Sequence, residues 1–522
     1  MSTKVTINRL ATGVPGLDDV LGGGLPEFSF NLIAGQPGCG KTTLAHQIMF
    51  ALATPARPAL YFTVLGEPPL KMLRYQQQFD FFKADALNTA IRFINLSEDA
   101  MAGNLDRVLR RIVDEVTLHG PALVFVDSFR SVILASATEG NEHNRLQQFV
   151  QQLGMLMTSW QATTFLIGEY FNETDANPVF TVADGLIWMR QSVQRNSMVR
   201  KMEILKMRGQ PTPPGLHTFR MGSAGIEVFA PTRADATARV ASAAAPSSAL
   251  LTMGVPGLDA MLGGGLPSGY SLLVAGPSGS GKSVLAAAFL AEGARCGETG
   301  IVLAFEQNPN HSRNRVVADL ISRGQVSLVD SRAPDLSIDE IVYLLLREIG
   351  RSGATRVVID SLSGFELALA PTFRDDFRES LARLVNALAG VGVTVLMTSE
   401  LEDRYTDLRF SPYGAAFMTD AIIVQRYIEV DSRLRRVMAV VKVRGMAHSD
   451  ELREFSINGQ GIVIGKILAD QEGLLGGRPT RKRLADLPDP GAGPTAAPTA
   501  APHSSADSSA DSSASSGQRD IA

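Results

Sequence analysis

The chain contains the same phosphate-binding pattern twice, and this repeat constrains its fold more than any other feature. Gly35 to Thr42 reads G-Q-P-G-C-G-K-T, and Gly276 to Ser283 reads G-P-S-G-S-G-K-S. Each stretch follows a short apolar run typical of a buried strand and precedes residues with helical spacing. In such a loop the backbone N–H groups surround a triphosphate, and glycine permits the curvature because it lacks a Cβ. The two loops stand 241 residues apart, so chance is a poor explanation.

The repeat extends beyond the loops. Thr12 to Pro26 and Met253 to Pro267 are identical at 12 of 15 positions, again 241 residues apart. A chain of 522 residues is also too long for one ordinary domain. We therefore predict two tandem copies of one domain, followed by a low-complexity tail. The predicted boundaries are 1–230 for the first copy, 231–250 for a linker, 251–468 for the second copy, and 469–522 for a basic segment and disordered tail.

Apolar runs alternate with helical periods in both copies, which predicts an α/β fold with a mainly parallel sheet flanked by helices. In the first copy we expect strands at 30–34, 59–64, 122–128 and 163–167, helices at 71–82, 105–116 and 146–159, and short antiparallel strands at 185–189, 201–207 and 225–229. In the second copy we expect strands at 271–275, 300–305, 356–361, 393–397, 438–443 and 461–464, and helices at 338–349 and 377–388.

Composition and charge indicate the cellular compartment and the kinds of partner that the chain can bind. The net charge is −4 and the isoelectric point about 6.0, which argues against a broad polyanion-binding surface. Two cysteines are too few for a disulfide framework and suit a reducing cytosol, so we expect a cytoplasmic protein. The N-terminal residues lack the apolar core of a signal peptide, and we find no apolar run long enough to span a membrane.

Each loop is predicted to bind ATP. Its lysine, Lys41 or Lys282, would place a positive charge beside the β- and γ-phosphates. Cys39 occupies a variable loop position, where a small filler is a simpler interpretation than a redox switch. The residues predicted to surround ATP are Gly35, Gly38, Cys39, Gly40, Lys41, Thr42 and Thr43 in the first copy, and Gly276, Ser278, Gly279, Ser280, Gly281, Lys282, Ser283 and Val284 in the second.

Mg²⁺ is predicted to lie beside each loop. Thr42 and Ser283 supply hydroxyls at the loop position that ligates Mg²⁺ in this motif. An apolar strand in each copy ends in Asp-Ser, at Asp127 and at Asp360. Carboxylate and hydroxyl oxygens suit a hard cation, so these four residues form the predicted metal-binding set. A cap at the end of the strand is the alternative role for either aspartate.

Hydrolysis also needs a side chain that orients the attacking water. We expect this group at the carboxyl end of the strand next to the phosphate-binding loop. The candidates are Glu306, which directly follows an apolar strand, and Glu67, which stands between Gly66 and Pro68. The context of Glu306 is the better of the two, so the second copy is the stronger candidate for chemistry.

A pair of cations recurs late in each copy. Lys206 and Arg208 match Lys442 and Arg444, each pair in a K-x-R-G pattern. Residues two apart on a strand share a face, and two neighbouring cations repel, so an anion between them is expected. The pairs lie far along the chain from the loops, which suits cationic fingers donated to a neighbouring subunit's γ-phosphate. A solvated strand face is the alternative.

The motifs together resemble the KaiC family, from about Leu10 to Ile467. The resemblance rests on the opening T-G-V-P-G-L-D-x-x-L-G-G-G-L-P, the two phosphate-binding loops, the acid-tipped strands and the K-x-R-G patterns. It implies two tandem RecA-like domains and two stacked rings of six subunits, with ATP between neighbouring protomers. It also implies slow ATP hydrolysis in the first ring and Ser/Thr autokinase activity in the second.

Two other functions are open on this fold. The family usually carries two adjacent glutamates at the catalytic strand tip, where this chain has Gly66-Glu67 and Glu306-Gln307. A scaffold that binds ATP only to assemble, without hydrolysis, is therefore one alternative. A DNA-dependent ATPase of the RecA or DnaB type is the other, although the net charge of −4 argues against a nucleic-acid partner.

The phosphoacceptor region also departs from the family. The family's Ser-Thr acceptor pair aligns with Ala416 and Phe417, whose side chains carry no hydroxyl. Thr419 is the candidate acceptor that remains, and Ser411 is a weaker one. We therefore expect a KaiC-like regulator of a signalling protein rather than a timekeeper.

Overall fold

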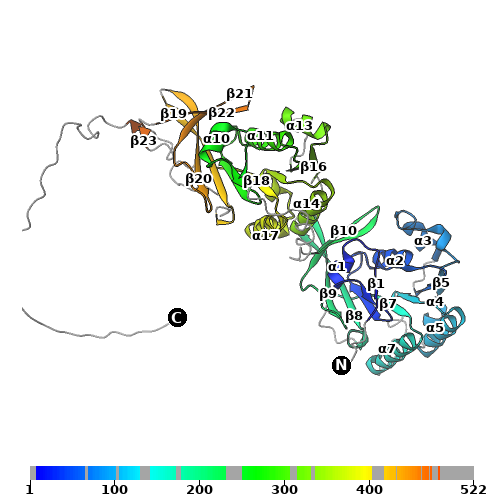
Figure 1. Cartoon of the computed structure of the whole chain (residues 1–522). Helices are drawn as coiled ribbons and strands as arrows, with labels where there is room; N and C mark the ends of the chain where they lie inside the picture. The colour runs from blue at the N-terminus through cyan, green and yellow to red at the C-terminus, as the bar shows by residue number, and fades with distance from the viewer. Residues whose placement is uncertain are drawn as a thin grey trace, which may run out of the picture.

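Two α/β domains of the same architecture lie side by side in the computed structural model (Figure 1). The described residues are 7–64, 69–101, 105–129, 142–171, 178–194, 196–230, 250–305, 314–330, 335–374, 376–401, 417–430, 432–459, 461–468, 471–472 and 480–481. Within these residues each domain is built on one nine-stranded sheet. Two mostly parallel sheets flanked by helices confirm the predicted fold class.

The first sheet has the strand order β11-β10-β9-β8-β3-β7-β6-β4-β5. These strands are β11 (Gly225–Phe229), β10 (His217–Gly222), β9 (Ser197–Met207), β8 (Gly185–Gln194), β3 (Phe30–Gly35), β7 (Thr163–Glu169), β6 (Leu123–Asp127), β4 (Ala59–Thr63) and β5 (Ile91–Asn95). The helices are α1 (Leu17–Leu21), α2 (Lys41–Leu52), α3 (Pro69–Gln76), η1 (Ala84–Ala86), α4 (Ser97–Met101), α5 (Leu105–His119), α7 (Glu142–Ser159) and α8 (Pro178–Val182). The short strands β1 (Arg9–Leu10) and β2 (Leu25–Pro26) pair beside this sheet.

The second sheet has the order β16-β15-β17-β18-β14-β19-β20-β21-β22. These strands are β16 (Val326–Asp330), β15 (Gly300–Ala304), β17 (Arg356–Asp360), β18 (Thr394–Glu400), β14 (Ser271–Gly276), β19 (Ala421–Val430), β20 (Arg433–Val443), β21 (Arg453–Asn458) and β22 (Gly461–Ile467). The helices are α10 (Pro256–Met261), α11 (Lys282–Arg295), α13 (Arg315–Ser322), α14 (Ile338–Ser352), α15 (Leu362–Ala368), α16 (Pro371–Arg374) and α17 (Phe377–Gly390). The short pair is β12 (Leu250–Leu251) and β13 (Leu266–Pro267).

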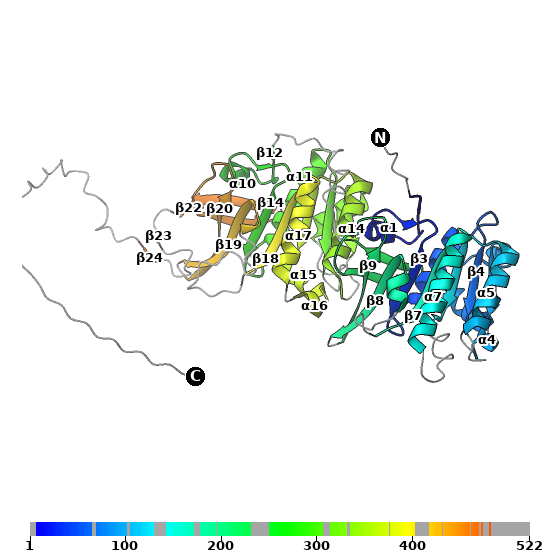
Figure 2. The same cartoon turned by 90° about the horizontal axis from the view of Figure 1, so that it is seen from below.

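Helices cover both faces of the parallel strands, because successive side chains of a strand point to opposite faces. In β3, Ile33 packs with Leu44 and Ile48 of α2. Its neighbour Leu32 packs on the other face with Val150 of α7. Figure 2 shows α5 and α7 along that second face. The sheet therefore holds the loop between β3 and α2 on a rigid, fully buried support.

Several elements differ from the sequence-based expectations. The helix expected at 71–82 is α3, which ends at Gln76, because Phe81 and Phe82 turn back to pack against Phe50 of α2. The antiparallel strands β8 and β9 are longer than predicted. The strands β5, β10, β16, β19 and β21 were not predicted from the sequence.

The predicted linker and tail fall largely outside the described residues. Positions 231–249 are not among them, and β12 already begins at Leu250. In the C-terminal segment the described part is the short pair β23 (Gln471–Glu472) and β24 (Thr480–Arg481). Among the helices of the described part, none has the length and apolar character needed to cross a bilayer.

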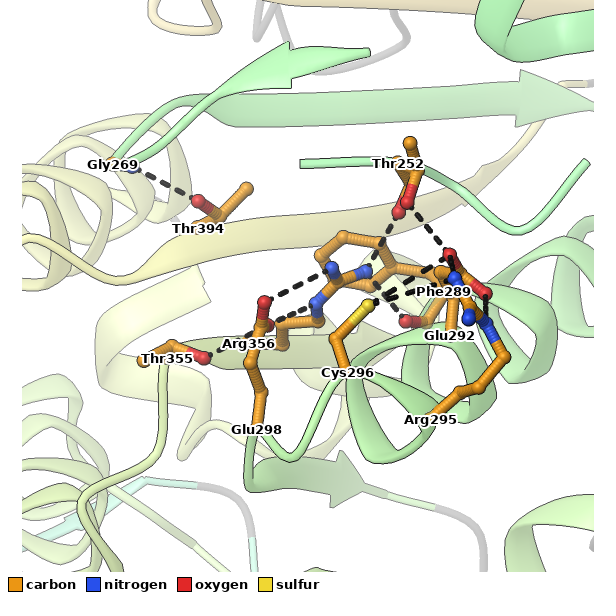
Figure 3. A network of polar contacts seen from close by, with 10 residues as sticks. All are labelled: Thr252, Gly269, Phe289, Glu292, Arg295, Cys296, Glu298, Thr355, Arg356 and Thr394. Carbon is orange, nitrogen blue, oxygen red and sulfur yellow. Dashed lines mark hydrogen bonds and ion pairs between the residues drawn. The ribbon is translucent and has the colours of Figure 1, made fainter. Parts of the chain in front are cut away.

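A buried arginine joins β17 to α11 and to two loops of the second domain (Figure 3). Arg356, at the start of β17, is 1% exposed. Its Nε donates to Glu298 at 2.6 Å, and its Nη1 donates to the carbonyl oxygens of Thr252 and Phe289 at 2.8 and 2.9 Å. Its guanidinium also lies 4.6 Å from the centre of the Phe289 ring. A buried charge is tolerated only when it is paired and hydrogen-bonded, and Arg356 meets both conditions.

The two domains contact each other through β10 and α14 (Figure 1). The Thr218 hydroxyl on β10 lies 2.8 Å from that of Ser337, which caps the N-terminus of α14. Two residues further along β10, Arg220 pairs with Glu340 and donates to the carbonyl oxygen of Asp335 at 3.1 Å. The end of α14 is therefore fixed to a strand of the neighbouring domain.

Candidate functional site

The first phosphate-binding loop surrounds a cavity of about 320 Å³. The strand β3 ends at Gly35 and α2 begins at Lys41, so the loop is the whole connection between them. Gly38 and Gly40 adopt φ values of 77° and 102°, which L side chains rarely adopt, and this explains the glycines. The cavity is lined by Gly38, Gly40, Lys41, Thr42 and Thr43 from the loop and α2, and by Asp127, Glu169 and Met221 from other strands.

The second loop repeats this geometry. Gly279 and Gly281 have φ values of 75° and 110°. Lys282 donates to the carbonyl oxygens of Gly276 and Pro277 at 2.8 Å each, and Lys41 donates to that of Gln36 at 2.8 Å. Each lysine ammonium is therefore held against its own loop, where it can contact bound phosphates. Burial lowers the pKa of Lys282, and the nearby carboxylates of Glu400 and Asp360 oppose that shift.

Oxygen donors for a metal ion meet at the base of the first cavity. The Thr42 hydroxyl donates to Asp127 Oδ2 at 2.8 Å, and the Tyr61 hydroxyl donates to the same oxygen at 2.7 Å. Burial raises the pKa of Asp127, while these two hydrogen bonds favour its charged form. A carboxylate and a hydroxyl within hydrogen-bonding distance of each other, in a cavity shaped for phosphates, fit the donor set that Mg²⁺ takes beside a nucleotide.

The corresponding aspartate of the second domain has different neighbours. Asp360 ends β17 as Asp127 ends β6, and both are followed by a cis peptide bond to serine. Asp360 is half-buried and accepts a hydrogen bond from the Thr398 hydroxyl of β18. Ser283 lies at the second position of α11, as Thr42 does in α2. The predicted metal-binding residues are thus positioned in both domains, by different supporting contacts.

The strand order corrects the prediction that Glu67 and Glu306 follow the strand next to the phosphate-binding loop. Glu67 and Glu306 both lie outside the described residues, so their roles stay predictions. The strands before them, β4 and β15, are not next to the loop strands, because β6 and β7 separate β4 from β3 and β17 and β18 separate β15 from β14. On the side of the sheet that leads to β4 and β15, the parallel neighbours of β3 and β14 are β7 and β18, which end in Glu169 and Glu400. Glu169 and Glu400 were not predicted as site residues, although each directly follows a run of apolar or small residues in its own copy.

The cationic pair of the first domain lies at the end of β9. The strand ends at Met207, so Lys206 is in the strand but Arg208 begins the turn, which corrects the prediction that both are on it. Lys206 donates to the carbonyl oxygen of Thr181 at 3.0 Å, and Arg208 donates to Asp184 at 3.0 Å. Burial and the nearby Arg208 lower the pKa of Lys206. The two cations therefore hold the segment before β8 in this protomer.

The second domain repeats the arrangement. Lys442 donates to the carbonyl oxygen of Thr419 at 2.7 Å, and Arg444, beyond the end of β20, donates to Asp420 at 3.1 Å. Thr419 itself is 0% exposed. Phosphate can therefore reach the predicted acceptor hydroxyl only after this segment moves.

Strand register shows how far each cationic pair lies from its own loop. Lys206 is level with Leu186, which is level with Leu32 of β3. Gly35, where the loop starts, is three residues further along β3, or about 10 Å, and two strands away, or about another 10 Å. In the second domain Lys442 is likewise level, through Ile422, with a residue three before the loop. Both pairs therefore lie away from the loop of their own domain, toward the end of the sheet at which the parallel strands begin.

Comparison with known proteins agrees with the repeated site. The family model described as "ATPase: KaiC" matches residues 10–233 and again residues 251–469. Two curated relatives are both named circadian clock oscillator protein KaiC. The one from Rippkaea orientalis is 27% identical over 494 residues, covering 92% of this chain and 93% of the relative. The one from a Picosynechococcus species is 26% identical over 489 residues, covering 91% and 93%. The chain therefore belongs to the KaiC family, with the ATPase domain present in two tandem copies.

Proposed function

We propose that the chain hydrolyses ATP at the interfaces between neighbouring subunits of a ring. The observation that carries this proposal is the position of the two K-x-R pairs at the far end of the sheet from their own loops. Cations placed there cannot contact the γ-phosphate of their own domain, whereas the next subunit of a ring could bring its loop to them. Six subunits in two stacked rings, as the family resemblance implies, would give every loop one such partner.

Each residue then has a chemical role. Lys41 and Lys282 neutralise charge on the β- and γ-phosphates, and Lys206, Arg208, Lys442 and Arg444 do so from the neighbouring subunit as charge develops on the transferred group. Thr42 with Asp127, and Ser283 with Asp360, would hold Mg²⁺, which supplies Lewis-acid stabilisation of the phosphate oxygens when bound. Glu67 and Glu306 are the proposed water-orienting residues that the sequence indicates.

The two rings would divide the work. We propose that the second domain, with Glu306 directly after its strand, performs most of the hydrolysis, and that ATP at the first domain chiefly holds the ring together. Such a double ring would act as a nucleotide-dependent regulator of a signalling protein in the cytoplasm. Autokinase activity in the second domain would require exposure of Thr419.

Incubation of the intact chain with γ-labelled ATP tests whether the chain hydrolyses ATP. We expect free labelled phosphate, loss of most of it in Lys282→Ala and Glu306→Gln, and loss of the assembled ring in Lys41→Ala. Label retained on the protein would indicate autokinase activity instead. Release of phosphate that neither Glu67→Gln nor Glu306→Gln reduces would contradict the assignment of both glutamates.

The position of the cations has its own test. Mixing a minority of Lys442→Ala subunits into wild-type rings should reduce turnover by more than the added fraction, because each mutant subunit impairs its neighbour's site. The exposed Lys466→Ala on β22 is the matched control and should leave turnover unchanged. Strictly proportional loss with Lys442→Ala would contradict donation between subunits.

A further inference from the structure

The carboxylates at the ends of β7 and β18 form a repeated feature that the motifs do not account for. We propose that Glu169 and Glu400 are catalytic residues of the two ATP sites, each orienting the water that attacks the γ-phosphate. This inference rests on the proposed function, because it assigns residues to the hydrolysis step of the same sites. It adds a second carboxylate to each site, beside the predicted Glu67 or Glu306.

Backbone geometry fixes Glu169 beside the phosphate-binding loop. In the parallel pairing of β3 and β7, Glu169 is level with Gly35, the first residue of the loop. The next N–H along the chain, that of Tyr170, donates to the carbonyl oxygen of Gly35 at 3.1 Å. Glu169 lines the cavity together with Lys41 and Asp127.

Side-chain alternation directs this carboxylate to the phosphate side of the sheet. Phe165 and Ile167 of β7 pack in the cluster that contains α2, and Glu169 continues their face. Asp127, at the end of the adjacent β6, continues the same face after Phe125. The negative charge of Glu169 raises the pKa of Asp127, which is consistent with their proximity.

The second domain shows the same arrangement independently. Glu400 is level with Gly276, and the N–H of Leu401 donates to the Gly276 carbonyl oxygen at 3.1 Å. Leu396 of β18 packs in the cluster that contains α11, so Glu400, four residues later, points toward the same side. Glu400 is the carboxylate that most strongly favours the charged form of Lys282. Two strands with different sequences thus place a carboxylate at one position of the site.

A carboxylate there suits one step of hydrolysis. A water oxygen forms a bond to the γ-phosphorus as the bond to the β–γ bridging oxygen breaks, and ADP leaves with that electron pair. One water proton stays on the released phosphate and the other passes to solvent. Glu169 or Glu400 accepts a hydrogen bond from this water and fixes its approach, which is worth about 10²–10⁴-fold in typical sites. A carboxylate also repels bound phosphate, so it should not improve ATP affinity.

Single-site backgrounds of the intact chain test each residue. Glu400→Gln is tested in a Glu67→Gln background, which keeps the ATP-binding lysine of the first loop and so the assembled ring, and Glu169→Gln is tested in a Lys282→Ala background. Each should lower kcat at least 30-fold while the Kd for a fluorescent ATP analogue changes less than threefold. Glu→Asp should restore part of the rate, since the charge is kept but the reach is shorter. The exposed Glu98→Gln on α4 and Glu379→Gln on α17 are controls with the same change of charge.

The readouts separate this inference from the proposed function. Unchanged kcat in both glutamine variants would overturn the assignment while leaving the ATPase proposal intact. Equal losses of kcat and of analogue binding would indicate a structural role and would also overturn it. A Glu67→Gln background that binds the analogue but releases no phosphate would contradict the proposed ATPase of the second domain. Binding of an ADP–aluminium fluoride complex would then still report the effect of Glu400→Gln. Loss of that trapped complex supports the inference, and its retention contradicts it.

Discussion

The two domains position the same aspartate with different supports. In the first, Asp127 is buried and accepts hydrogen bonds from Thr42 and from Tyr61, whose ring stacks on His46 at 4.6 Å. The equivalent positions of the second domain hold small apolar residues, Val302 for Tyr61 and Ala287 for His46. The repeat thus keeps the loop and its acid, while the layer beneath them varies.

At the start of the strand that ends in this aspartate, the second domain has the polar contacts and the first domain lacks them. Arg356 begins β17 with its buried ion pair, and Leu123 begins β6 at the equivalent position. In the first domain the buried polar contacts are therefore those to Asp127, at the end of β6. In the second domain they are those of Arg356, at the start of β17. Substitutions that remove either set should affect one domain and spare the other.

The largest effect is expected at Arg356. Arg356→Ala leaves the Glu298 carboxylate and two backbone carbonyls without their donor and should lower the free energy of unfolding of the second domain by about 3–5 kcal/mol. Arg356→Leu, the residue found in the first domain, should cost less. Hydrogen exchange read by mass spectrometry should show faster exchange in α11 and β17. Arg351→Ala, which removes an exposed pair with Glu348, is the control and should lower stability far less, because solvent screens that pair.

Equal stability of Arg356→Ala and Arg351→Ala would show that the buried pair adds nothing. The sequence could not have predicted this network, because an arginine at a strand boundary reads as a solvated edge. Its partners come from residues 252, 289 and 298, which only the fold brings together.

Local motifs explain what the sequence did predict. The two loops and the aspartates that end β6 and β17 belong to short sequence patterns, and such patterns have the same local geometry in different proteins. Strand order is not local, so the placement of β7 beside β3 and the position of Glu169 could not be predicted. Arg208 was assigned to a strand because the K-x-R pattern has the strand period, but Arg208 begins a turn that continues through Gly209, whose φ is 84°. The glutamates at 67 and 306 lie outside the described residues and stay predictions.

Acid should destabilise the first domain selectively, through His46. Burial lowers the pKa of His46 to about 4, against 6.5 when exposed, and its Nε2 has no hydrogen-bond partner among the described residues. The unfolded chain therefore takes up a proton at higher pH than the folded one. The resulting loss of stability is absent above pH 6.5, grows as the pH falls to about 4, and reaches about 3 kcal/mol.

Urea unfolding at pH 7.5, 5.5 and 4.5 measures this term as the difference between wild type and His46→Gln. The variant keeps a hydrogen-bonding side chain but does not titrate, so its stability should fall less steeply with acid. The second domain, with Ala287 at this position, supplies the internal comparison. Parallel pH profiles for the two proteins would contradict the assignment to His46.

A smaller effect is expected from the hydroxyl of Tyr61. Tyr61→Phe removes one of two donors to a buried carboxylate and should cost the first domain about 1–2 kcal/mol without nucleotide. With Mg²⁺ and ATP the cost should shrink, because the metal would then stabilise the charge on Asp127. Thermal unfolding with and without MgATP checks this. Tyr270→Phe is the control, since that hydroxyl donates to the carbonyl oxygen of Arg444 instead. A cost that MgATP leaves unchanged would argue against Asp127 as a metal ligand.

The smallest effect is expected where the two domains meet. Met221 of β10 lines the cavity at the first phosphate-binding loop, and its neighbour Arg220 pairs with Glu340 of the second domain. The corresponding strand β21 instead pairs its Arg453 with Glu451 of its own domain. Arg220 is 38% exposed, so solvent screens the pair and a coupling of about 0.5–1 kcal/mol is expected.

A double-mutant cycle of Arg220→Ala and Glu340→Gln isolates that coupling from the separate effects of each change. The quantity to measure is how much ATP bound at the first loop raises the free energy of unfolding of the second domain. The measurement uses a Lys282→Ala background, in which the first loop is the one left to bind ATP. Because Arg220 and Met221 point to opposite faces of β10, nucleotide contact on one face can shift the strand that holds α14 on the other. A coupling that is zero without nucleotide and zero with it would assign β10 to packing alone, whereas a coupling that appears only with ATP would make it the link between the two sites.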